Sequence, residues 1–187
     1  MKKLIALLLV VLMVLSLVAC GGEDKPEGGK TDEGGNAVAE VKGEVYDTGI
    51  FKTLIPEGWK AFPVSDMFSE EENATDPEKL QIIKGGETEW DLFSKPYVAI
   101  NIFPNNSLLT PSKDWYDNAA DLEPLAIGGY TWNGFTAESA GVPMAMLWTE
   151  DAKGNDIQVT VMLKTTDGEV TLEDADVRAI IESIQAN

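Results

Sequence analysis

An apolar run near the start of the chain limits which residues can join a folded domain. Met1-Lys2-Lys3 is a short positive segment, and residues 4–18 are apolar except for Ser16. This order of charge, apolar run and small residue is typical of a secretory signal. A helix over that run would span about 22 Å, which is too short for a hydrocarbon core of about 30 Å. We therefore expect residues 1–19 to be a removable export signal, with the fold after them.

The end of this run resembles the lipobox of bacterial lipoproteins. Leu17-Val18-Ala19-Cys20 matches the pattern Leu-x-(Ala/Ser/Gly)-Cys, and Cys20 is the only cysteine in the sequence. The resemblance implies cleavage between Ala19 and Cys20, diacylglycerol on the Cys20 thiol, and commonly a further acyl chain. Two or three acyl chains hold a protein stably on a membrane, whereas one does so only marginally. We expect a lipid anchor at Cys20; the alternative is a secreted protein with a stray cysteine.

The segment after the cysteine has the composition of a tether. Residues 21–35 consist mainly of Gly, Glu, Asp and Lys, with one Pro and no large apolar side chain. Such a segment cannot bury enough apolar surface to offset the entropy lost on ordering. We expect residues 20–43 to be a disordered tether and residues 44–187 to be a single domain. The Gly/Glu-rich tether favours the extracellular face of a Gram-positive cell membrane.

The charged-residue composition excludes several functions. The chain has 32 acidic and 14 basic residues and no histidine, for a net charge of −18. Removing residues 1–19 takes away Lys2 and Lys3 but no acid, so the charge falls to −20. Histidine-dependent triads and histidine zinc sites are impossible. Because a strongly acidic surface repels phosphate, we expect no nucleic-acid partner.

The hydrophobic pattern predicts several strands and three helices. Alternating apolar and polar residues predict strands over 44–55, 59–64, 80–84, 97–103, 135–139, 144–149 and 157–164. Gly128-Gly129 predicts a hairpin between 125–127 and 130–132, with Asn133-Gly134 as a competing tight turn or a bulge. Helices are predicted over 66–72, 112–121 and 171–185, the last with the apolar stripe Val177, Ile180, Ile181 and Ile184. The prediction is an α+β domain, an antiparallel β-sheet with helices packed on it.

Three segments resemble the PsbP/DcrB-like group of small extracytoplasmic domains. They are Phe51–Trp59, which reads FKTLIPEGW, the hairpin at Gly128-Gly129-Tyr130, and the closing segment Ile180–Ile184. The resemblance implies an α/β sandwich with an accessory or binding role and no catalytic residues. We therefore expect a non-catalytic envelope protein that binds another envelope protein or a small ligand. The alternatives are a carboxylate-based, glycosidase-like hydrolase and a purely structural tethered domain.

Two tryptophans and one acidic segment are the candidate contact sites. Aromatic residues in such a domain more often belong to the core. Trp90, which lies in a polar segment, is the first candidate for exposure to a ligand or partner, and Trp132, beside Asn133-Gly134, is the second. The acidic candidates for a calcium ion are Glu70, Glu71, Glu72 and Asp76. A run of like charges is more often a solvated face, so no cofactor is expected beyond this calcium hypothesis.

Two short motifs resemble known sites but lack the rest of them. Asp47-Thr48-Gly49 matches the aspartic-protease tripeptide, yet that chemistry needs two copies and the chain has one. Residues 151–156 resemble the start of a calcium loop, but Lys153 and Met162 occupy ligand positions of an EF-hand. Both motifs are interpreted as turns.

Overall fold

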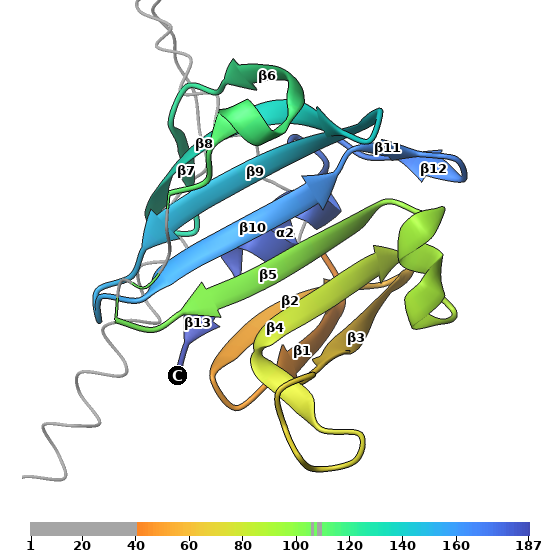
Figure 1. Ribbon diagram of the computed structural model, residues 1–187, viewed down its shortest axis with the longest axis vertical. Helices are drawn as coiled ribbons and strands as arrows, with labels where there is room; N and C mark the ends of the chain where they lie inside the picture. The colour runs from red at the N-terminus through yellow and green to blue at the C-terminus, as the bar shows by residue number, and fades with distance from the viewer. Residues whose placement is uncertain (1–40, 106, 108–109) are drawn as a thin grey trace, which may run out of the picture. The chain divides into compact units, whose positions relative to one another are not determined.

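The computed structural model describes residues 41–105, 107 and 110–187 (Figure 1). The predicted export signal, the lipidation site at Cys20 and the tether as far as residue 40 lie outside the described residues. The chain divides into two units between Ala37 and Val38, and the described residues belong to the second unit.

Antiparallel strands make up most of this unit. A small sheet has the order β1-β2-β13, formed by Gly43–Asp47, Phe51–Pro56 and Gln185–Ala186. A large sheet has the order β3-β4-β5-β10-β9-β8-β6, formed by Trp59–Ser65, Thr75–Lys84, Tyr97–Phe103, Asp156–Met162, Val142–Glu150, Tyr130–Ser139 and Asp117–Asp121. The remaining elements are η2 (Glu89–Phe93), η3 (Lys113–Trp115), β7 (Leu125–Ile127), β11 (Lys164–Thr165), β12 (Gly168–Glu169) and α2 (Ala175–Glu182).

The predicted fold class is wrong, because the domain is β-rich. Of the described residues, 52% are in strands and 11% in helices, and α2 is the single α-helix among them. An α+β sheet with several helices packed on it is therefore not the architecture. Each of the three predicted helices is either absent or shorter than expected.

Local side-chain bonds explain why residues 66–72 are not helical. Asp66 Oδ1 accepts from the Phe68 backbone N–H, and Ser69 Oγ accepts from the Glu71 backbone N–H. Short polar side chains that bond nearby backbone groups compete with helix formation. The segment is therefore the turn between β3 and β4.

The predicted helix over 112–121 begins as expected and then becomes a strand. Ser112 Oγ accepts from the Asp114 backbone N–H, which starts the short helix η3. At Tyr116 the backbone is extended, and β6 then pairs with β8. The gain in packing outweighs local helix propensity, because Tyr116 and Ala119 cover a cluster that contains Phe135 and Met144.

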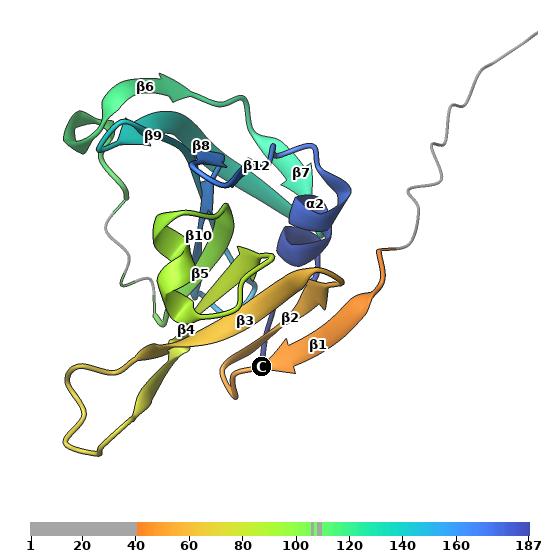
Figure 2. The same cartoon turned by 90° about the vertical axis from the view of Figure 1, so that its right-hand side faces the viewer.

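The main core lies between the large sheet and the elements inside its curve. Figure 2 shows α2 there, with β2 beneath it. The predicted apolar stripe is buried at all four positions, of which Val177, Ile180 and Ile181 lie on α2 and Ile184 lies after it. The helix is shorter than predicted because the chain extends after Ser183 into β13, which pairs with β2. The buried core residues include Phe51, Val98, Ile100, Trp132, Leu147, Val159 and Ile180.

The hairpin predicted at Gly128-Gly129 is confirmed. Both glycines have positive φ, at 64° and 79°, and they connect β7 to β8. A Cβ on Gly128 would lie 2.6 Å from the Glu182 backbone O, so this turn packs directly on the end of α2. The competing turn at Asn133-Gly134 is wrong, because both residues lie within β8.

Candidate functional site

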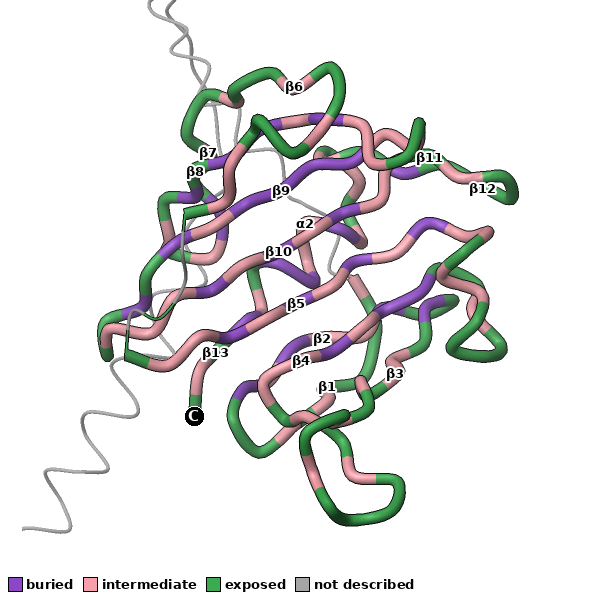
Figure 3. Tube along the Cα trace, in the orientation of Figure 1, coloured by how far each residue is buried: buried purple, intermediate pink, exposed green. Residues whose placement is uncertain are grey.

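Four large apolar side chains are exposed around one groove. The exposed fractions are 93% for Phe68, 86% for Met67, 74% for Phe93 and 68% for Trp90. Met67 and Phe68 come from the β3–β4 turn, and Trp90 and Phe93 from η2; we call these four residues the tip surface. Figure 3 shows the β3–β4 turn as a largely exposed loop at one edge of the large sheet, whose central strands alternate between buried and intermediate residues. Burial of a Phe or Met side chain gains about 1.5–3 kcal/mol, so the free domain forgoes much stabilisation here.

Backbone bonds fix the β3–β4 turn that carries two of these side chains. The Asp66 N–H donates to the Ala74 O at 2.9 Å, which closes the turn. Asn73 adopts a left-handed φ of 63°, a conformation that Asn tolerates better than most residues. The turn has a defined course that holds Met67 and Phe68 outside the core.

Asp91 organises the segment that carries the other two. Its Oδ2 accepts from the Glu87 N–H at 2.7 Å, the Thr88 N–H at 3.2 Å and Lys95 Nζ at 3.3 Å. The backbone N–H groups of Glu87 and Thr88, and then Lys95, lower the pKa of Asp91. The carboxylate therefore stays ionised at neutral pH and secures η2. On that support the Trp90 and Phe93 rings stack with centroids 6.3 Å apart and planes 14° apart.

A groove of about 330 Å³ joins the two segments. The lining residues come from β3, the β3–β4 turn, β4 and η2: Pro63–Phe68, Asp76, Lys79, Gln81, Glu89, Trp90, Leu92 and Phe93. Lys79 Nζ lies 2.7 Å from Asp76 Oδ2. The side-chain hydrogen bond to Asp76 raises the pKa of Lys79, so the pair presents almost no net charge to the groove. The groove is thus apolar at Trp90 and Phe93 and acidic at Asp66 and Glu89.

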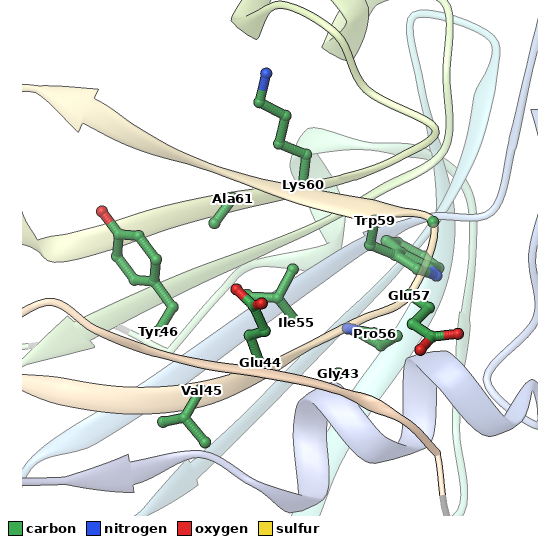
Figure 4. A pocket seen from close by; sticks show the side chains of 11 residues that line it. Gly43, Glu44, Val45, Tyr46, Ile55, Pro56, Glu57, Trp59, Lys60 and Ala61 are labelled. Atoms are coloured by element: carbon green, nitrogen blue, oxygen red, sulfur yellow. The ribbon is translucent and has the colours of Figure 1, made fainter.

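A second hollow, of about 390 Å³, lies between β1 and β3. Figure 4 shows Tyr46, Ile55 and Ala61 facing into it, whereas Lys60 points away. Its two carboxylates, on Glu44 and Glu57, are both exposed and come from β1 and from the β2–β3 turn. This hollow is a solvated cleft with no shielded pair of acids at its base, so it adds no support for the hydrolase alternative, which stays a prediction.

The predicted exposure of the two tryptophans has opposite outcomes. The exposure of Trp90 is confirmed, and the residue belongs to the tip surface. The predicted exposure of Trp132 is wrong, because its side chain is fully buried and its Nε1–H donates to the Ile127 O at 3.1 Å. The β7–β8 turn brings that carbonyl to the indole, and this satisfies the one polar group of the ring.

The four acidic residues predicted to bind calcium differ in their surroundings. Glu70, Glu71 and Glu72 are exposed in the β3–β4 turn, whereas Asp76 is paired with Lys79. Across the described residues, no group of three or more acidic or thiol side chains is arranged to hold a metal ion. The calcium hypothesis stays a prediction without structural support.

The two motifs interpreted as turns are confirmed as turns. Asp47 Oδ1 accepts from the Gly49 N–H at 2.8 Å. In the β9–β10 turn, Asp151 Oδ1 accepts from the backbone N–H groups of Lys153 and Asn155. Burial raises the pKa of Asp151, but these bonds outweigh that effect and the net pKa is lowered. Both aspartates accept hydrogen bonds from backbone N–H groups of their own turns.

Sequence reasoning missed three of the four tip residues. Met67, Phe68 and Phe93 are large apolar residues within acidic, strand-poor sequence. That mismatch between residue type and local polarity is the signal that singled out Trp90. Applied to every apolar residue in those segments, it indicates the whole tip surface.

Comparisons with known proteins give no family. No family model matches the chain, and no curated protein matches it. A protein of Bacteroides thetaiotaomicron VPI-5482, known from a crystal structure at 1.50 Å resolution, matches with a TM-score of 0.41 and 12% identity. The match covers 78% of this chain and 48% of the other, so this chain spans about half of that protein's length. The resemblance to the PsbP/DcrB-like group stays a prediction from sequence.

None of the helices in the described part of the chain has the length and hydropathy needed to cross a membrane.

Proposed function

We propose that this protein is a lipid-anchored, extracytoplasmic binding protein that docks an envelope protein through the tip surface. The observation that carries the proposal is the exposure of Met67, Phe68, Trp90 and Phe93 around one groove. Exposed apolar patches mark interaction sites, and aromatic residues and Met are enriched where proteins meet. The gathering of four such side chains around one groove favours a binding role over a purely structural one.

A protein partner fits this surface better than a membrane does. The groove combines an aromatic wall with acidic side chains at its rim, including Asp66 and Glu89. Acidic groups oppose approach to anionic headgroups but suit a protein surface of opposite charge. The proposed anchor at Cys20 would keep the domain near envelope proteins without requiring the tip surface to enter the bilayer.

Site-specific photocrosslinking in the host envelope tests the docking proposal. A photoreactive residue at Phe68 or Phe93 should crosslink one protein, whereas the same residue at Trp115, which is exposed outside the groove, should not. Mass spectrometry identifies the crosslinked protein, which is then purified. It should bind the full-length wild type and lose at least about tenfold in affinity for Phe68→Ser/Trp90→Ser. Equal crosslinking at Trp115, or unchanged affinity, would overturn the proposal.

Mass spectrometry of membrane-extracted protein tests the anchor. The wild type should lack residues 1–19 and carry acyl mass on Cys20, and Cys20→Ala should lose that mass. An unlipidated mature protein in the medium would contradict the anchor while leaving the docking proposal to its own test.

A further inference from the structure

We infer that the tip surface binds a cationic amphipathic segment, one in which basic side chains flank apolar ones. This inference rests on the proposed function, because it assumes that the tip surface is the docking site. It specifies the chemistry of the partner from the charges that surround the four apolar side chains.

The tip has a strong excess of negative charge. Residues 64–93 contain nine acidic side chains and two lysines. Both lysines have local contacts: Lys79 pairs with Asp76, and Lys84 Nζ lies 5.9 Å from the centroid of the Trp59 ring. Two lysines outside this range also reach it, since Lys60 Nζ donates to the Glu87 O and Lys95 Nζ lies 3.3 Å from Asp91 Oδ2. The segment therefore offers acidic side chains to a partner and holds its own cations in place.

The acidic side chains lie next to the apolar ones. Asp66 and Glu89 line the groove itself, beside Phe68 and Trp90 in the chain. Glu70, Glu71 and Glu72 follow Phe68 along the same turn and are exposed. A partner that covers the tip surface therefore brings its own flanking residues close to these carboxylates.

Charge complementarity selects a basic partner over the other occupants. Opposite charges that flank an apolar contact speed association and suppress wrong partners, since like charges brought together cost several kcal/mol. A second copy of this chain would bring the same acidic tip, and its net charge of −18 opposes self-association. Anionic lipid is disfavoured for the same reason. A segment with Lys or Arg on either side of apolar residues satisfies both parts of the site.

The groove accounts for the apolar half of the recognition. The stacked pair Trp90–Phe93 forms one wall, and Phe68 and Met67 approach from the β3–β4 turn. An apolar side chain of the partner can enter between them and exclude water from both surfaces. Exclusion of water lowers the local dielectric constant and strengthens the attraction between flanking charges.

Three synthetic peptides of about 18 residues test the inference, each an amphipathic helix with the same Leu positions. The polar positions hold Lys, Gln or Glu. Binding to full-length, lipid-anchored protein in zwitterionic nanodiscs is measured by fluorescence anisotropy of labelled peptide, with empty discs subtracted. The Leu/Lys peptide should bind at least about tenfold more tightly than Leu/Gln, and Leu/Glu should bind most weakly. Raising the salt concentration to about 0.5 M should remove most of the Leu/Lys advantage.

Matched variants separate charge from apolar contact. Neutralising Glu70, Glu71, Glu72 and Glu89 to Gln should reduce Leu/Lys affinity to that of Leu/Gln. The control neutralises four exposed acids outside the groove lining, Asp114→Asn, Asp117→Asn, Glu123→Gln and Asp167→Asn, and should change affinity less than about twofold. Phe68→Ser/Trp90→Ser should abolish binding of all three peptides.

The outcomes distinguish this inference from the proposed function. Equal binding of Leu/Lys and Leu/Gln, both lost in Phe68→Ser/Trp90→Ser, would overturn the cationic partner and leave the docking site standing. Peptide binding that survives Phe68→Ser/Trp90→Ser would overturn both. Failure of every peptide to bind would overturn the cationic segment and leave the docking proposal to the crosslinking test. Preferential binding to nanodiscs that contain anionic lipid would also overturn the inference.

Discussion

Trp132 and Trp90 show how one residue type serves opposite purposes in two regions of this domain. Trp132 is fully buried in the main core, with its indole N–H bonded to the Ile127 O. Trp90 is 68% exposed and stacks only on Phe93 among the ring contacts of the described residues. The core region is stabilised by its aromatic residue, whereas the tip leaves an aromatic residue in water.

Different contacts hold the chain around each tryptophan: close packing at Trp132 and hydrogen bonds to the backbone at the tip surface. At the core, a glycine turn and α2 pack closely enough that a Cβ on Gly128 would touch Glu182. At the tip, Asp91 and Asp66 bond the backbone and hold the chain in place while leaving side chains free. Polar contacts to the backbone thus order the segments that carry the tip surface, and its apolar side chains are available for a partner.

The largest expected effect is on folding at the core tryptophan. Trp132→Ala should lower the free energy of unfolding by about 3–5 kcal/mol, because it removes a buried ring and leaves a cavity. Trp90→Ala should change it by less than about 0.5 kcal/mol, since the residue is exposed. Urea denaturation followed by circular dichroism measures both. A similar loss of stability in the two variants would show that Trp90 contributes to folding as much as Trp132 does.

The second-largest expected effect is the difference in stability between alanine substitutions at the two glycines of the β7–β8 turn. Both have positive φ, so alanine at either position costs about 1–2 kcal/mol. Gly128→Ala also places a Cβ against the Glu182 backbone, whereas the Cβ of Gly129→Ala would have no neighbouring atom within 4 Å. Gly128→Ala should therefore be more destabilising by about 1–3 kcal/mol in the same denaturation assay. Equal losses would show that the turn does not press on α2.

Removing a hydrogen bond between β2 and α2 should lower the free energy of unfolding by a smaller amount. Thr53 is buried, and its hydroxyl donates to the Ile180 O at 3.0 Å. Thr53→Val keeps the shape but removes the donor, and should cost about 1 kcal/mol. Thr131→Val, on an exposed side chain of β8, is the control and should be close to neutral. A neutral Thr53→Val would mean that this bond adds little to the core region.

The smallest effect concerns the order of the tip and depends on pH. The lowered pKa of Asp91 means that its contribution is complete above the ordinary value of 3.8 and is lost as the pH falls through the lower pKa of the folded state. Asp91→Asn should speed hydrogen exchange at the Glu87 and Thr88 amides at neutral pH. The difference from wild type should shrink in acid. Unchanged exchange at neutral pH would show that Asp91 does not order η2.

Strand pattern and glycine turns were readable from the sequence, because they depend on residues close together in the chain. Tyr97–Phe103 is a strand with its Val98 face buried, as the alternation predicts. Residues 112–121 were misassigned because Tyr116 and Ala119 pack on Phe135 and Met144, contacts that the segment itself does not encode. The tip surface likewise depends on two segments, around Phe68 and Trp90, meeting at one groove. Local polarity can mark each of these apolar residues separately, but it does not show that the two segments share a groove.

On this proposal, the tip surface binds a protein partner and contributes little to the free energy of unfolding. The most direct test measures Leu/Lys peptide affinity and the free energy of unfolding in full-length wild type, Phe68→Ser/Trp90→Ser and Trp115→Ser. We expect Phe68→Ser/Trp90→Ser to lose binding while its free energy of unfolding stays within about 1 kcal/mol of wild type, and Trp115→Ser to keep both the affinity and the stability of wild type. Retained affinity in the tip variant, or loss of folding together with binding, would contradict the account.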